Sequence, residues 1–176
     1  DLFPLNTVVF PHEKILLRVF ETRYLNLIEM CHDEARPFGI CLIRDGEEVG
    51  APPVPFNIGT SVVIKDIKNM SDKFLYIAVW GERRFRVKRF IQEQPHIKVE
   101  IDWIDKEIPY FPGNYSQLRN TTADFLKDKS KIPEDDNELF GLAGTLIAMH
   151  SWEKQKILEH TDKKVIPALT RFMESI

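Results

Sequence analysis

The spacing of apolar residues along the chain changes near residue 110. Before this point, apolar and polar residues mostly alternate, a period of two that is typical of half-buried antiparallel strands. After it, apolar residues recur every three or four positions, as on one face of an amphipathic helix. The pattern therefore predicts a β-rich part over residues 1–108 and a helical part over residues 109–176.

The β-rich part is predicted to contain about six strands and one helix. Extended segments are expected at residues 7–10 and 14–20, on either side of Pro11, because proline is tolerated at strand ends and edges. Apolar residues at three- and four-residue steps predict a helix over residues 21–35. The almost fully apolar run at residues 38–43 predicts a buried strand.

The clearest alternation lies further along the β-rich part, where Gly81 and Glu82 are expected to form a turn between two strands. Strands are predicted over residues 60–67, 74–80, 83–91 and 97–103. In the third of these, one face carries Phe85, Val87 and Ile91, and the other carries Arg84, Arg86 and Lys88. Such a set of strands favours a twisted barrel or a rolled sheet.

Four helices are predicted after a hinge of proline, glycine and aromatic residues at 109–114. Asp135, Asp136 or Asn137 is expected to cap the second helix, and Ser151 the third. Side-chain oxygens at these positions accept hydrogen bonds from backbone N–H groups that the first helical turn leaves free. The helices predict a small bundle, and the fold class is therefore α+β.

The amino-acid composition excludes several classes of partner but does not assign a function. Lys and Arg number 24 against 27 Asp and Glu, a net charge of −3, so the whole chain has no general attraction to nucleic acid. Cys31 and Cys41 are the only cysteines, which fits a reducing cytoplasm better than a disulfide framework. No apolar run approaches the roughly 18 residues of a membrane span. We expect no membrane partner, no metal and no cofactor.

Two short patterns suggest catalysis but have simpler interpretations. Ser151 and Lys154 match the S-x-x-K pattern of some acyl enzymes, yet the companion motifs are absent, so a capping serine and a solvated lysine are favoured. Cys31 precedes His32, but Cys31 belongs to the apolar stripe of its helix and is expected to be a buried structural residue. Phosphate-binding loops and dinucleotide fingerprints are also absent from the sequence.

The one basic cluster lies in the strand over residues 83–91. Arg84, Arg86 and Lys88 share a face there, and neighbouring phenylalanines would allow bases to stack while the cations contact phosphates. A solvated face of a half-buried strand is the simpler interpretation, given the acidic balance of the chain. Binding of RNA or other nucleic acid therefore stays open as an alternative function.

Seven segments, taken in order, carry a further pattern. They read LFPLNTVVFP at 2–11, LRVFETRY at 17–24, FGICLI at 38–43, IGT at 58–60, GERRFRV at 81–87, LAGTLIA at 142–148 and EKQKILE at 153–159. In this order they resemble the N-terminal substrate-binding domain of Lon proteases. Each segment alone is weakly specific, and their shared order over nearly the whole chain makes the resemblance strong.

The resemblance implies a PUA-like pseudo-barrel followed by a helical bundle, the same division that the periodicity predicts. It also implies recognition of unfolded or tagged polypeptides, and a role in assembling the protease. The ATPase and Ser–Lys protease modules of Lon are not in this sequence, so we expect a non-catalytic domain. A stand-alone protein that acts with a protease or ATPase partner and a part of a longer enzyme both agree with this resemblance.

A polypeptide-binding domain needs an exposed apolar groove or a free strand edge. Tyr110, Phe111 and Tyr115 lie where the two parts should meet, a common place for clefts, and Trp80 and Trp103 are further candidates. Each aromatic residue is more often part of a core than of a ligand site. A scaffold or homo-oligomerisation domain is the remaining alternative.

Overall fold

The computed structural model describes residues 1–71 and 73–176, and the side chains of all of these except residues 69–71. The described residues of the first part of the chain form seven strands and one helix: β1 (Leu2–Leu5), β2 (Lys14–Val19), α1 (Thr22–Asp33), β3 (Phe38–Asp45), β4 (Val54–Pro55), β5 (Ile58–Ser71), β6 (Phe74–Gln92) and β7 (Lys98–Trp103). The second part contains α2 (Tyr115–Leu126), a 3-10 turn (Lys129–Lys131), α3 (Asp136–Leu146), α4 (Ser151–Leu158) and α5 (Asp162–Ser175). The predicted α+β class is confirmed.

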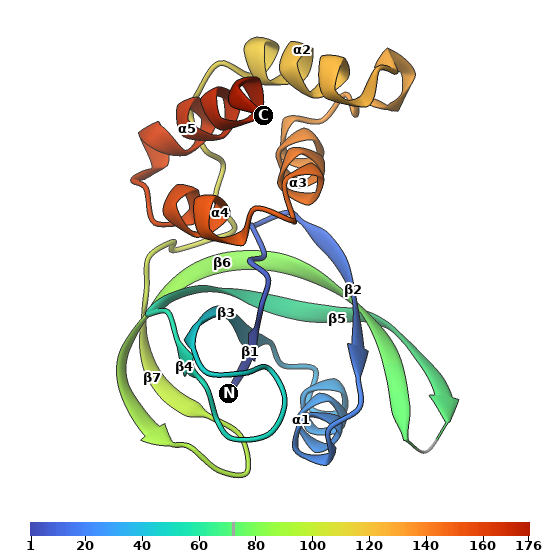
Figure 1. The fold of residues 1–176 in the computed structure, drawn as a ribbon, viewed down its shortest axis with the longest axis vertical. Helices are drawn as coiled ribbons and strands as arrows, with labels where there is room; N and C mark the ends of the chain where they lie inside the picture. Colours follow the sequence, from blue (N-terminus) through green and yellow to red (C-terminus); the bar gives the residue numbers. More distant parts are fainter. Residues whose placement is uncertain (72) are drawn as a thin grey trace.

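The strands form one mixed sheet with the order β1-β3-β5-β6-β2. β4 adds to β3, and β7 adds to β6. β1 pairs with β3 in parallel, and the other pairings are antiparallel. β5 and β6 sweep across the whole sheet, with α1 at one end of it and α2–α5 gathered at the other (Figure 1). Among the described strands, β1 and β2 stand at the two ends of this order, and the Leu2 N–H at the start of β1 donates to the Ile97 carbonyl at 2.9 Å.

Two of the predicted strand boundaries are wrong. The first strand is β1 at Leu2–Leu5, while residues 7–10 form no strand, because β1 pairs with β3 and its Pro4 is tolerated at an edge. The second error is the turn at Gly81 and Glu82, through which β6 runs unbroken. Gly81 instead admits the close approach of the Phe10 carbonyl, which a side chain at this position would block.

The core is shared between the two parts of the chain. Phe10 and Leu42 from the β-rich part pack in one cluster with Phe140 and Leu169 from the helices. A second cluster lies between the sheet and α1, where Tyr24, Leu27, Ile28 and Cys31 are buried. The change of secondary structure falls where the sequence predicts it, but the two parts bury apolar surface against each other. Whether residues 1–108 and 109–176 act as separate folding units stays a prediction.

Helix capping follows the sequence at one position and departs from it at another. The Asp135 carboxylate accepts a hydrogen bond of 2.9 Å from the backbone N–H of Glu138, so the predicted cap of α3 is confirmed. Ser151 is the first residue of α4 rather than its cap, and its hydroxyl donates to the Asn6 carbonyl at 2.8 Å. Within the described chain, no helix combines the length and apolarity that a bilayer crossing requires.

Candidate functional site

The five predicted aromatic residues do not form one site. Trp80, Trp103 and Tyr110 are 41%, 43% and 58% exposed, whereas Phe111 and Tyr115 are buried. Trp80 lies in the middle of β6, and Trp103 lies at the end of β7. Tyr110 stacks on Tyr115 at the hinge, with 5.4 Å between ring centroids. Three separate exposed aromatic positions therefore replace the single cleft that the sequence suggested.

Phe111 belongs to the core between the sheet and the helices. Its ring lies 5.0 Å from that of Phe140, and the Arg84 guanidinium lies 4.8 Å from its centroid. Tyr115 is buried in the same cluster. These two side chains present almost no surface to a ligand, and their placement gives them a packing role.

The predicted basic face of residues 83–91 is divided by burial. Arg86 and Lys88 are exposed, but Arg84 is almost completely buried, which corrects its assignment to a solvated face. The Lys88 ammonium lies 3.5 Å from carboxylate oxygens of both Glu100 and Asp102 on β7. These carboxylates raise the pKa of Lys88 and neutralise its charge locally. Of the three predicted cations, only Arg86 is therefore exposed without a carboxylate partner among the described side chains, and one free cation falls short of the several phosphate contacts of a nucleic-acid site.

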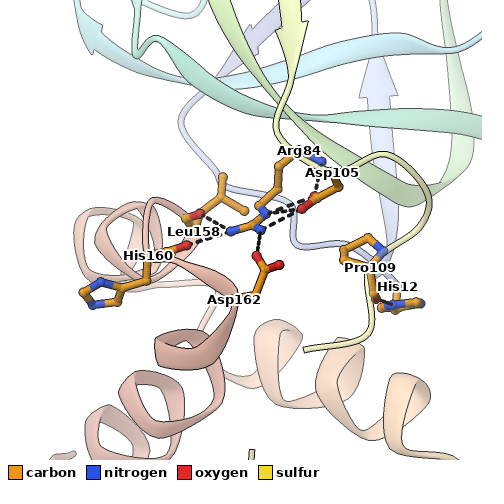
Figure 2. Close-up of polar contacts among 7 residues, drawn as sticks. All are labelled: His12, Arg84, Asp105, Pro109, Leu158, His160 and Asp162. Carbon is orange, nitrogen blue, oxygen red and sulfur yellow. Dashed lines mark hydrogen bonds and ion pairs between the residues drawn. The ribbon is translucent and has the colours of Figure 1, made fainter. Parts of the chain in front are cut away.

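Arg84 joins three distant segments of the chain (Figure 2). Its guanidinium binds both carboxylate oxygens of Asp105, at 2.7 Å from Nη2 to Oδ1 and 3.0 Å from Nε to Oδ2. Nη1 donates to the carbonyls of Leu158 and His160 at 3.1 and 2.8 Å, and Nη2 lies 2.5 Å from Asp162 Oδ1. Burial alone would lower the pKa of Arg84, but Asp105 and Asp162 outweigh it and raise that pKa. Arg84 thus fixes the α4–α5 corner to the sheet.

A second buried ion pair joins the two parts of the chain. The Lys154 ammonium lies 2.7 Å from each carboxylate oxygen of Glu13, and both side chains are almost fully buried. Desolvation lowers the pKa of Lys154, although the charge and hydrogen bonds of Glu13 oppose this shift. The prediction of a solvated lysine is wrong, because its partner lies 141 residues away in sequence. With Ser151 bonded to Asn6 instead, the S-x-x-K pattern has a structural role.

His12 adds a third link between the sheet and the hinge. Its Nε2 lies 2.5 Å from the Pro109 carbonyl oxygen (Figure 2). His12 has a φ of 66°, a left-handed conformation that its neighbours impose. Backbone hydrogen bonds of 2.9 Å from His12 to Gly81, and from Gly81 to Glu13, hold this loop against β6. These contacts connect the hinge before the helical part to the start of β2 and to β6.

One hollow lies between the edge strands β1 and β2, with a volume of about 200 Å³. We call this hollow the seam. Its floor is apolar, and its rim carries three exposed apolar residues: Leu16 (68%), Phe20 (48%) and Val49 (53%). Phe3, Leu5, Leu17 and Tyr24 form the floor. The sequence does not reveal this rim, because Leu16 stands in the apolar run 15–17, where no alternation separates buried from exposed positions.

A larger hollow of about 510 Å³, with more charged side chains in its lining, lies beside Trp80, between the sheet and α3. The ammonium groups of Lys14 and Lys65 lie 4.4 and 5.1 Å from the Trp80 ring centroid. Lys14 also reaches Glu138 on α3, at 3.5 Å. The indole ring is therefore held between two cations, next to the end of β2.

The two cysteines and the possible metal ligands were compared with what a nucleophile or a metal site requires, within the described residues. Cys31 and Cys41 are free and buried. Burial raises the pKa of Cys41 to about 12 and also raises that of Cys31, so both thiols stay protonated. The interpretation of Cys31 as a structural residue is confirmed. Among the side chains that the structure describes, no three His, Cys, Asp or Glu residues gather as metal ligands would.

Comparison with known families places the chain in the family of Lon substrate-binding domains. The sequence model described as "ATP-dependent protease La (LON) substrate-binding domain" matches residues 1–165. The Lon protease of Dictyoglomus thermophilum is 29% identical over 96% of this chain and 24% of its own length. The Lon protease of Syntrophus aciditrophicus is 24% identical over 89% of this chain and 22% of its own length. The chain thus spans about a quarter of the curated relatives that it matches.

Solved structures give the same result for the fold. A Lon N-terminal domain protein from Xanthomonas campestris superposes with a TM-score of 0.72 at 28% identity, over 98% of this chain and 96% of that one. The N-terminal domain of a Mycobacterium avium complex Lon protease superposes with a TM-score of 0.64 over the same shares. Its 15% identity supports the fold alone.

Proposed function

Because the chain belongs to the Lon substrate-binding domain family, we propose that it recognises unfolded or tagged polypeptides for an ATP-dependent protease. One observation carries this proposal beyond the family match: exposed apolar side chains, together with Arg18, Glu21 and Glu48, line a hollow with an apolar floor beside an unpaired strand edge. Folded proteins keep their apolar side chains and strand edges covered, so this surface suits a chain that has lost its fold.

The domain supplies binding and no catalysis. Its buried charged residues are engaged in structural pairs, and its two thiols are buried. ATP hydrolysis and peptide cleavage would come from the protease that receives the substrate. Free buried cysteines also suit a reducing compartment, and we infer a cytoplasmic location.

The nucleic-acid alternative is the weaker one. Arg84 is buried, Lys88 is paired with carboxylates, and the family match points to polypeptides. Homo-oligomerisation is a further property of such a domain that sedimentation would test, and it does not replace polypeptide binding.

Fluorescence anisotropy tests the proposed function directly. The ligand is a fluorescein-labelled protein kept unfolded by reduction and carboxymethylation of its cysteines, and the control is the same protein with its native disulfides intact. We expect binding to the unfolded form only, with modest loss as salt increases, because apolar burial dominates. Labelled single-stranded RNA is titrated in parallel. Binding to RNA alone, with a steep decrease as salt increases, would contradict the proposal.

A further inference from the structure

The outer edge of β2 has free backbone hydrogen-bonding groups. Among the described residues, β6 is the only strand that pairs with β2. The Gly81 N–H donates to the Glu13 carbonyl at 2.9 Å, so the backbone of Glu13 faces β6. Backbone groups alternate sides along an antiparallel strand, and those of Lys14, Leu16 and Arg18 therefore face away from β6.

The same three residues place exposed side chains on one face of β2. Leu16 is 68% exposed, and a cation stands two residues away on each side of it. The Arg18 guanidinium lies 4.7 Å from the Phe74 ring centroid, and none of the described carboxylates forms an ion pair with it. Lys14 contacts the Trp80 ring, at 4.4 Å from its centroid, and has a surface pair with Glu138 that is 3.5 Å long between two half-exposed side chains. Such pairs contribute little, so both cations are available to a ligand.

The other face of this edge opens onto the seam. The Leu17 side chain lies on the buried face of β2. With Phe3 and Tyr24 it forms an apolar floor beneath the gap between β1 and β2. A strand beside β2 would direct alternate side chains toward this floor and the remaining ones toward Lys14, Leu16 and Arg18. The edge thus combines free backbone groups, an apolar floor and two cations at a fixed spacing.

We propose that a substrate segment adds to the edge of β2 as an antiparallel strand, and that the preferred segment is an acidic residue, three apolar residues and an acidic residue. This inference rests on the proposed function and specifies its substrate. The central apolar residue stands opposite Leu16 and exchanges two backbone hydrogen bonds with it. The acidic residues stand opposite Arg18 and Lys14, where opposite charges stabilise a strand pair. The two intervening apolar side chains enter the seam.

The probe is a fluorescein-labelled peptide, Gly-Asp-Val-Leu-Val-Asp-Gly, titrated with the 176-residue chain. N-methylation of the central Leu removes a donor to β2 and should weaken binding at least roughly tenfold, the equivalent of about 1.4 kcal/mol. N-methylation of the Val before it alters an N–H that faces away from β2, and this matched control should bind nearly as well as the parent. Equal binding by the central N-methyl peptide would overturn strand addition.

Two protein variants test the same site from the other side. Leu16→Pro removes an outward N–H, which an edge strand tolerates, whereas Leu16→Ala removes only the side chain. We expect Leu16→Pro to weaken peptide binding roughly tenfold, several times more than Leu16→Ala. Circular dichroism and thermal unfolding confirm that both variants are folded. Equal peptide affinities of the two folded variants would show that the backbone N–H of Leu16 does not contribute to binding.

Exchanging charges between Arg18 and the peptide tests both the register and the direction of the added strand. In antiparallel addition, the first acidic residue of the probe stands opposite Arg18, so Arg18→Glu should weaken binding of the parent peptide roughly fivefold. Gly-Lys-Val-Leu-Val-Asp-Gly should restore affinity for Arg18→Glu, and Gly-Asp-Val-Leu-Val-Lys-Gly should not. Restoration by the second peptide instead would overturn the antiparallel register.

The outcomes separate this inference from the function on which it rests. If the unfolded protein binds with equal affinity to wild type and Leu16→Pro, polypeptide binding stands and the β2 edge is rejected. If neither the unfolded protein nor the peptide binds wild type, both the function and the edge are rejected. If Leu16→Pro weakens binding of the unfolded protein and of the peptide to a similar extent, polypeptide binding and its location at the β2 edge are both supported.

Discussion

The junction between the sheet and the helices uses its charges differently from the edge of β2. At the junction, Arg84 and Lys154 are buried and each is paired with at least one carboxylate. At the edge, Arg18 is exposed without a carboxylate partner among the described side chains. Burying an unpaired charge costs a large amount of free energy, so buried charged side chains are found in ion pairs. An exposed cation is hydrated and needs no protein partner, which leaves it free to bind a ligand. Location, rather than residue type, separates the structural cations from the binding ones.

The largest expected effect comes from breaking the Glu13–Lys154 pair. Lys154→Ala leaves the Glu13 carboxylate buried without its ammonium, and we expect the free energy of unfolding to decrease by about 3–5 kcal/mol. Urea denaturation followed by circular dichroism measures this loss. The double variant Glu13→Gln with Lys154→Met removes both charges and should be more stable than Lys154→Ala. A loss below about 1 kcal/mol would place Lys154 among ordinary surface lysines.

Phe111→Ala should be nearly as damaging. The ring is 1% exposed, and its removal should cost about 3–5 kcal/mol through lost apolar contact and the cavity left behind. Tyr110→Ala, at a neighbouring position that is 58% exposed, should change stability by less than about 1 kcal/mol and serves as the control. Comparable thermal unfolding of the two variants would contradict the division between core and surface at the hinge.

Arg84→Ala should destabilise the α4–α5 corner by about 2–3 kcal/mol, because two backbone carbonyls lose their donor and Asp105 keeps only the backbone N–H of residue 84. Arg84→Lys should not restore stability, since an ammonium cannot reproduce the forked geometry. Chemical denaturation gives the loss for each variant. Full stability of Arg84→Lys would show that charge alone holds the corner.

Leu16→Ala should separate binding from stability. The side chain is largely exposed, so unfolding should change by no more than about 0.5 kcal/mol. Affinity for the carboxymethylated unfolded protein should fall roughly threefold as contact with the ligand is lost. Anisotropy and thermal melts on one preparation measure both. A large loss of stability with unchanged affinity would show that Leu16 supports the fold and does not contact the ligand.

The smallest effect is expected on the exposed face of β6. Arg86→Ala and Lys88→Ala should each alter stability by no more than about 0.5 kcal/mol and leave polypeptide affinity unchanged. Single-stranded RNA titrated against wild type and both variants provides the contrast. A clear loss of RNA affinity in either variant would revive the nucleic-acid alternative.

Sequence periodicity predicted helices and strands well where their position depends on neighbouring residues alone. Period-two alternation located β7, and the Asp135 cap located the start of α3. The alternation around Phe85 predicted one buried and one solvated face of β6, and it was right for Phe85 but wrong for Arg84, which is buried as well. It gave no information on what covers the polar face, because Leu158, His160 and Asp162 reach Arg84 from 74 to 78 residues further along the chain.

The candidate site was harder to predict for a related reason. An exposed residue in an apolar run, such as Leu16, looks like core until the strand order shows that β2 is an edge. The hinge aromatics were expected to face a cleft, but Phe111 is needed to fill the core between sheet and helices. Strand order and shared cores depend on non-local pairing, which single-sequence patterns do not encode.

The most direct test of the account is amide hydrogen exchange, measured residue by residue with and without the unfolded protein. The account predicts that the amides of Lys14, Leu16 and Arg18 become protected on binding, while those of Ile15 and Leu17, already paired with β6, change little. Unchanged exchange along β2, with new protection at residues 108–115 or beside Trp80, would contradict it and move the binding site to the junction.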